Sequence, residues 1–198
     1  MSYAVIQPPF TLKFREMSDH ELGEYRRWFL GTISERLNEL QHAVTSSSGL
    51  ENWLPDRSPS SLDALGHWLA QQVETRPRTA DELARVKERG TFDIDVSGDE
   101  LTNKTFSLAM DVGMYLAETL LQHYPKLEWD QPLDDKKFAD FGQMVLRGFG
   151  RVPLNPVRIA VNFCYGVATG KQSGKRLKEI YDYWSRLAAG AGGVVKAR

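Results

Sequence analysis

The sequence predicts a mainly α-helical protein with a small β-element, and three observations support this fold class. Apolar residues recur at helical spacing over several long stretches, helix-capping patterns precede most of them, and strict apolar–polar alternation is confined to short segments. The 198 residues are 41% hydrophobic and 26% charged, as expected of one folded domain with a sizeable core. We expect a single globular domain over 1–198, with about five to six helices packed around a helix at 103–124 and a flexible tail from about 190.

The central helix is expected at about 103–124 because apolar residues form one wide face there. Gly113 lies within this face and costs about 1 kcal/mol relative to alanine, so we expect another element to cross closely at that point. Pro125 ends the helix. The polar residues on the opposite side, which we expect to face solvent, are Ser107, Asp111, Glu118 and Gln122.

The remaining elements follow from capping residues and periodicity. The other expected helices run from Ser18 to about Val44, Ser58 to about Arg76, Thr79 to about Arg89, Asn155 to Gly170 and Ser173 to about Ala188. The short segments 126–129 and 143–146 are expected to be strands. Residues 10–17 are expected as a short strand or extended chain, and 92–96 as an extended linker or edge strand.

The sequence shows no complete pattern of a metal site, a cofactor site or a membrane-spanning segment. The four histidines form no zinc-binding spacing with the single cysteine, so we expect no metal and no cofactor. Cys164 lies on an apolar helix face and is expected to be a buried thiol rather than a nucleophile. One cysteine, no signal peptide and no apolar run long enough for a bilayer together predict a cytoplasmic protein.

The segment 166–171, with the sequence GVATGK, has the appearance of a phosphate-binding loop. Such a loop requires four residues between the glycines and a serine or threonine after the lysine, and here one residue is missing and Gln172 takes the hydroxyl position. The segment also lies between two expected helices rather than after a strand. We therefore expect a helix–turn–helix connection without a nucleotide.

Asp111 and Glu118 lie two turns apart on one face of the central helix. A pair of carboxylates can act as a general acid and a general base when both line one pocket. An alternative function is therefore a small enzyme that uses this pair in a pocket beside the core helix.

The net charge of −1 conceals two oppositely charged parts of the chain. Residues 92–140 contain eleven acidic and four basic residues, whereas residues 141–198 contain ten basic and two acidic residues. These parts could attract each other within the fold. Alternatively, the acidic part could form a surface that steers a basic protein partner. The residues expected on that partner-binding surface are Asp93, Asp95, Asp99, Glu100, Glu128, Asp130, Asp134 and Asp135.

The basic stretch 171–178 could contact nucleic acid, but it lacks interleaved aromatic residues and has acidic neighbours. We do not expect nucleic acid as the partner.

Three longer stretches carry a family resemblance. They are the segment Ser18-x-x-Glu21-Leu22-x-x-Tyr25-x-x-Trp28-Phe29, the segment Asp111-Val112-Gly113-Met114-Tyr115-Leu116-Ala117-Glu118 running to Trp129, and Phe141-Gly142-Gln143-x-Val145-x-x-Gly148-Phe149 before Asn155-Pro156. The chain resembles a family of uncharacterised bacterial proteins similar to small immunity proteins, with Ala117 where glycine is expected. The resemblance implies a protein that binds a toxin domain and occludes its active surface, and it implies no catalytic residues.

Overall fold

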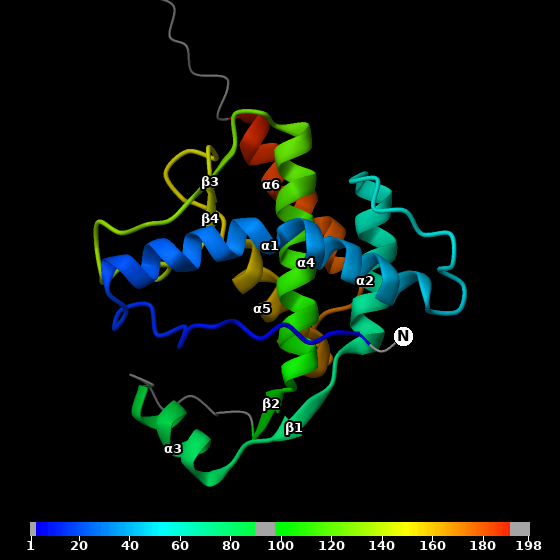
Figure 1. Cartoon of the computed structure of the whole chain (residues 1–198). Helices are drawn as coiled ribbons and strands as arrows, with labels where there is room; N and C mark the ends of the chain where they lie inside the picture. The colour runs from blue at the N-terminus through cyan, green and yellow to red at the C-terminus, as the bar shows by residue number, and fades with distance from the viewer. Residues whose placement is uncertain (1–2, 90–97, 191–198) are drawn as a thin grey trace, which may run out of the picture.

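Helix α4 runs through the middle of the molecule, and the other elements are arranged around it (Figure 1). The computed structural model describes residues 3–89 and 98–190. This part of the chain forms a mainly helical single domain with six helices and two small two-stranded hairpins, which confirms the predicted fold class. The helices are α1 (Asp19–Thr45), α2 (Pro59–Gln72), α3 (Ala80–Arg89), α4 (Asn103–His123), α5 (Pro156–Ala168) and α6 (Arg176–Gly190).

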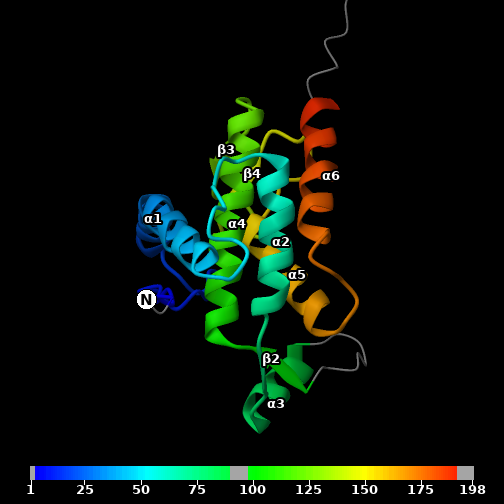
Figure 2. The same cartoon turned by 90° about the vertical axis from the view of Figure 1, so that its right-hand side faces the viewer.

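The helices form layers on either side of α4. α1 crosses α4 on one side, while α5 and α6 lie on the other and α2 lies beside α4 (Figures 1 and 2). One cluster of buried side chains joins α2, α4, α5 and α6, and a second joins the first half of α1 to Met110, Met114, Phe141 and Met144. α4 therefore belongs to both clusters.

α4 is buried around its whole circumference in its central turns, which corrects the expectation of a solvated polar face. Gln122 is exposed as expected, but Ser107 and Asp111 are buried and the Glu118 side chain is only 20% exposed. The reason is that α1 and the N-terminal segment cover this face. The Ile6 backbone N–H donates to the Ser107 hydroxyl at 2.8 Å, so the segment is bonded directly to α4.

Gly113 marks the close helix crossing that the sequence predicts. A Cβ atom added at this position would lie 2.8 Å from the carbonyl oxygen of Pro156 and 2.8 Å from the Cα of Val157. The first turn of α5 therefore packs directly on the α4 backbone. A similar contact joins α2 to the loop before α6, where a Cβ on Gly66 would lie 2.2 Å from the Gly174 carbonyl oxygen.

The predicted helix starts are confirmed except that of the last helix, which begins at Arg176 rather than directly after Ser173, and one predicted helix end is wrong. The Ser18 hydroxyl accepts from the Glu21 N–H at 3.3 Å, and the Glu21 carboxylate accepts from the Ser18 N–H at 2.8 Å, which completes the capping box of α1. α2 ends at Gln72 rather than near Arg76. The chain leaves the helix because residues 75–77 pair with another strand.

The two hairpins are antiparallel and lie at opposite ends of α4 (Figure 1). β1 (Thr75–Pro77) pairs with β2 (Asp99–Leu101), and β3 (Glu128–Asp130) pairs with β4 (Val145–Arg147). The strands predicted at 126–129 and 143–146 therefore exist, displaced by one or two residues. α3 projects from the body beyond β1 (Figure 1). The extended segment expected at 92–96 lies outside the described residues.

Residues 10–17 form extended chain with a turn and no strand. Phe10 and Phe14 instead pack edge-on against Tyr25 of α1, with ring centroids 5.7 and 4.9 Å apart. Aromatic contacts with α1, rather than strand pairing, therefore hold this segment.

We expect Gly113→Ala to lower the free energy of unfolding by at least about 2 kcal/mol, because the new methyl group would overlap the α5 backbone. Gly31→Ala in α1 is the matched control, since nothing lies within 4 Å of its added Cβ. There we expect a gain of up to about 1 kcal/mol from helix propensity. Urea unfolding measures both values, and equal effects would contradict the close crossing.

Cys164 is fully buried in α5, and burial raises the pKa of its thiol to about 12. Because the thiolate is the reactive form, we expect no modification by a thiol reagent at pH 8 in the folded protein, and rapid modification in denaturing urea. Modification at the same rate in both conditions would contradict this burial.

Candidate functional site

The acidic residues that were predicted to bind a partner and that the structure describes do not form one surface. Asp99 and Glu100 lie in β2 before α4, whereas Glu128 and Asp130 lie in β3 after it. α4 has 21 residues, so the two groups are separated by roughly 30 Å of helix. Asp134 and Asp135 belong to the second group by their place in the chain; the two other predicted residues, Asp93 and Asp95, lie outside the described residues.

At the β1–β2 end, Glu100 holds elements of the fold together. Its carboxylate accepts hydrogen bonds from the Arg78 guanidinium and from the Tyr165 hydroxyl of α5. Arg78 also donates to the Asp99 carbonyl oxygen at 3.1 Å. The Glu100 carboxylate thereby links the base of the α3 projection to α5. Its negative charge is balanced by the Arg78 guanidinium.

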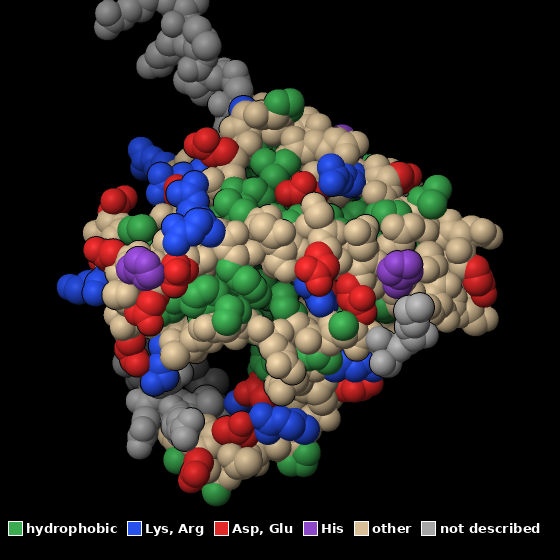
Figure 3. Space-filling view, viewed as in Figure 1, with side chains coloured by type: hydrophobic (Ala, Val, Ile, Leu, Met, Phe, Trp, Pro, Cys, Tyr) green, Lys and Arg blue, Asp and Glu red, His purple; other side chains and the backbone are tan. Residues whose placement is uncertain are grey.

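At the β3–β4 end, acidic and basic residues from the two oppositely charged parts of the chain meet. Asp130 pairs with Arg147 across the strands at 2.5 Å, and Asp140 pairs with Arg158 at 2.7 Å. These ion pairs show that the two parts attract each other at these points. The space-filling view shows acidic, basic and hydrophobic side chains interspersed on this side of the molecule rather than one uniformly acidic surface (Figure 3).

A depression of about 480 Å³ lies between residues 132–138 and the loop 147–153, and we call it the β3–β4 depression. Asp134 and Asp135 contribute carboxylates, and Arg147 and Arg151 contribute guanidinium groups. Its apolar lining residues are Pro132, Phe138, Val152 and Pro153. A concave surface lined by apolar residues and by charges of both signs can bind an apolar side chain and a charged group of a partner together.

Glycine residues shape the loop on one side of the depression. Gly148 and Gly150 have φ values of +112° and +106°, a region that side chains with a Cβ rarely adopt. Gly148 also packs closely on the preceding connection, because an added Cβ would lie 2.9 Å from the Lys126 carbonyl oxygen. The β-hairpin and these glycines therefore set the depression's shape.

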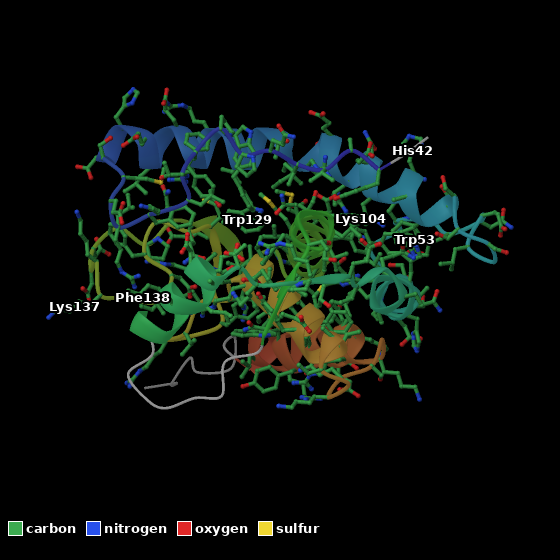
Figure 4. All side chains as sticks on the ribbon, turned by 90° about the horizontal axis from the view of Figure 1, so that it is seen from below. His42, Trp53, Lys104, Trp129, Lys137 and Phe138 are labelled. Atoms are coloured by element: carbon green, nitrogen blue, oxygen red, sulfur yellow. The ribbon has the colours of Figure 1, made fainter. Side chains whose placement is uncertain are left out.

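Hydrogen bonds hold the acidic side of the depression in place. The Arg15 side chain donates to the carbonyl oxygens of Lys136 at 2.8 Å and Phe138 at 3.3 Å. The buried Gln131 amide donates to the carbonyl oxygens of Leu22 and Gly142 at 3.0 and 2.9 Å. The segment 132–141 is therefore anchored to α1 and to the N-terminal segment. Figure 4 shows Lys137 and Phe138 at the end of the molecule remote from His42.

Large hydrophobic side chains are exposed around this anchored segment. Leu133 is 46% exposed and Val152 is 66% exposed, and Leu12 on the neighbouring N-terminal segment is 44% exposed. They are three of the six large hydrophobic side chains that are exposed within residues 3–84 and 98–190. Periodicity could not identify them as a group, because they come from three segments distant in the chain.

The second candidate site, the carboxylate pair, is not formed by the fold. Asp111 is fully buried and accepts two hydrogen bonds from Arg36 of α1, at 2.9 Å from Nε and 2.7 Å from Nη2. The Tyr3 hydroxyl also donates to Asp111. Burial raises the pKa of the Asp111 carboxyl, and the hydrogen bonds and positive charge of Arg36 oppose that rise. Asp111 is therefore a structural carboxylate and not a solvated surface residue.

Glu118 faces a different part of the molecule. Its carboxylate accepts from the Trp129 indole N–H at 3.2 Å and lies 3.7 Å from the Arg57 guanidinium. It lines a polar cavity of about 230 Å³ between α1 and α4, which Asp111 does not line. The two carboxylates thus have separate partners and share no cavity of this kind.

Within the described ranges, no group of three or more His, Cys, Asp and Glu side chains could hold a metal ion. No helix in the same residues is long and apolar enough to cross a bilayer. A scan against protein-family models and searches of curated proteins and of solved structures found no match to this chain.

We expect Asp111→Asn and Arg36→Met each to lower the free energy of unfolding by about 3 kcal/mol or more, because each leaves a buried group without its charged partner. The double variant Asp111→Asn/Arg36→Met should lose less than the sum of the two, since no unpaired charge remains. Urea unfolding of all four proteins measures the coupling. Glu35→Gln on the exposed face of α1 is the control, and additive losses would contradict the pairing.

Proposed function

We propose that the protein is a binding protein that contacts a protein partner through the β3–β4 depression. The observation that carries this proposal is the combination, at one place, of a 480 Å³ depression with exposed Leu133 and Val152 beside it. Exposed apolar side chains grouped around a concave surface are characteristic of protein interaction sites. The anchored segment 132–141 supports the proposal further, because a surface that is already ordered loses little conformational entropy on binding.

The charges at the depression suggest the nature of the partner. Arg147 is paired with Asp130, whereas Asp134 has no hydrogen-bond or ion-pair partner among the described residues. Asp135 accepts from the Lys137 N–H at 2.8 Å and remains exposed. The two accessible carboxylates outnumber the one remaining lining cation, Arg151, so the depression is suited to a basic group that adjoins an apolar one on the partner. We infer a partner with a basic surface.

The resemblance to immunity proteins supplies the proposed biological role. On that basis, the partner is a toxin domain, and the protein neutralises it by binding and occluding its active surface. The depression provides a rigid, mixed-polarity surface for such a contact. The alternative enzyme function receives no support from the site. The Asp111 carboxylate accepts hydrogen bonds from Arg36 and Tyr3, and the Glu118 carboxylate bonds to Trp129 in another part of the molecule.

The first experiment is to purify the tagged protein from its native cell and to identify what is recovered with it at equal stoichiometry. A single toxin-like protein whose activity is inhibited by the purified chain would support the proposed role. A partner without toxic activity would contradict that role but leave the binding surface to be tested separately.

We expect Asp134→Lys to slow association with the partner about threefold to tenfold at low ionic strength, because it reverses a charge that attracts a basic surface. Val152→Asp should weaken binding about fivefold or more by placing a charge in the apolar contact. Surface plasmon resonance measures both rate constants, and circular dichroism checks that both variants are folded.

Glu35→Lys is the matched control, because Glu35 is exposed on α1 and its substitution changes the net charge by the same amount. Association of this variant should match that of the wild type. If Glu35→Lys and Asp134→Lys slow association equally, only net charge matters, and the depression is not the binding surface.

A further inference from the structure

A second concave surface lies between α5 and α6, on the side of α4 opposite to α1 (Figure 4). This α5–α6 groove has a volume of about 400 Å³. Its lining includes Asn162 and Phe163 of α5 and Arg176, Tyr183, Trp184 and Arg186 of α6. It shares no lining residue with the β3–β4 depression, so it constitutes a separate candidate site.

The groove presents aromatic rings that are held in fixed orientations. Trp184 packs edge-on against Phe149 with ring centroids 4.8 Å apart, and Tyr183 packs perpendicular to Trp184 at 5.7 Å. Tyr183 is nevertheless 52% exposed. An exposed ring supported from behind by other rings is suited to stacking with a planar ligand.

The same surface carries an excess of positive charge. The groove is lined by two cations, Arg176 and Arg186, and one carboxylate, Glu179, and residues 156–190 as a whole contain six basic and two acidic side chains. Both acidic side chains are paired within α6, Glu179 with Arg176 at 3.2 Å and Asp182 with Lys178 at 2.7 Å. By contrast, Lys171, Lys175 and Arg186 have no carboxylate partner in the described part of the chain.

A smaller concavity of about 380 Å³ adjoins the groove and shares Gln172, Arg176 and Glu179 with it. Lys171 and Ser173 line this second space. The loop before α6 therefore adds a cation, Lys171, and a hydroxyl group, Ser173, next to the aromatic groove. An anion next to a stacked ring would find hydrogen-bond donors there.

The glycine-rich loop 166–171 itself is not a phosphate cradle. The backbone N–H of Gly170 donates to the Val167 carbonyl oxygen at 2.9 Å, and those of Lys171 and Gln172 donate to the Gly166 carbonyl oxygen at 2.8 and 3.0 Å. These donors are satisfied within the turn. Recognition of a phosphate here therefore depends on side chains.

We propose that the α5–α6 groove binds a nucleotide unit, a nucleobase joined through its sugar to a phosphate, either as a free nucleotide or as part of a single-stranded nucleic acid. The base stacks on Tyr183, and the phosphate is met by Arg186, one turn further along α6, whose planar guanidinium group matches phosphate geometry. The aromatic rings that the basic sequence stretch lacks are supplied by the next turns of α6, since Tyr183 and Trp184 lie in the same groove as Arg176.

The test is fluorescence anisotropy with a labelled oligothymidylate of about 12 nucleotides at low salt, using the full chain. We expect saturable binding that weakens about tenfold in Tyr183→Ala, because stacking is lost. In Arg186→Ala the slope of log affinity against log salt should fall by about 0.7, the value for one phosphate contact to a single strand.

Leu54→Ala and Arg26→Ala are the controls, because they remove an exposed apolar side chain and an exposed cation outside this groove. Both should bind as the wild type does. Competition by thymidine monophosphate shows that a single nucleotide suffices, whereas its failure to compete shows that a strand is required.

The proposal is overturned if the oligonucleotide does not bind at low salt, or if Tyr183→Ala and Arg186→Ala both behave as the controls do. It is also overturned if polyglutamate displaces the oligonucleotide at equal charge concentration, because the groove would then select acidic chains without regard to a stacked ring.

Discussion

The pairing of Arg36 with Asp111 is the interaction on which the arrangement of the layers depends. A helix that is buried on all sides must find an internal partner for each polar side chain, because an unpaired buried charge costs several kcal/mol. Asp111 of α4 meets this requirement with Arg36 of α1 and with Tyr3 of the N-terminal segment. Arg36 also donates to the Ala4 carbonyl oxygen at 2.9 Å, so one buried cluster fixes three segments of the chain.

The layer on the opposite side of α4 is fixed by close packing rather than by charge. The absence of a side chain at Gly113 lets the backbone of α5 approach α4 directly, and Gly66 allows the same between α2 and the loop before α6. Such contacts leave little freedom in the distance between helices. The two hairpins at the ends of α4 and the groove between α5 and α6 are consequently presented on a rigid body.

This architecture separates two surfaces of different chemistry. The β3–β4 depression combines exposed Leu133 and Val152 with carboxylates, and the α5–α6 groove combines exposed Tyr183 with cations. The oppositely charged parts of the chain neutralise each other at Asp130–Arg147 and Asp140–Arg158. The charge that remains for a partner is therefore local, on residues such as Asp134 and Arg186, and does not extend over a whole face.

The sequence by itself determined most of the helices and the capping box at Ser18, because these features depend on residues close together in the chain. Gly113 within an apolar face indicated a close crossing, but only the tertiary structure shows that α5 makes it. The sequence did not determine that Asp111 is buried, since the wheel of α4 places it opposite the apolar face and only the crossing of α1 covers it. It also could not show that the six predicted acidic residues within the described part of the chain fail to form one surface. Which side chains share a surface depends on contacts between distant segments, and the tertiary structure alone decides them.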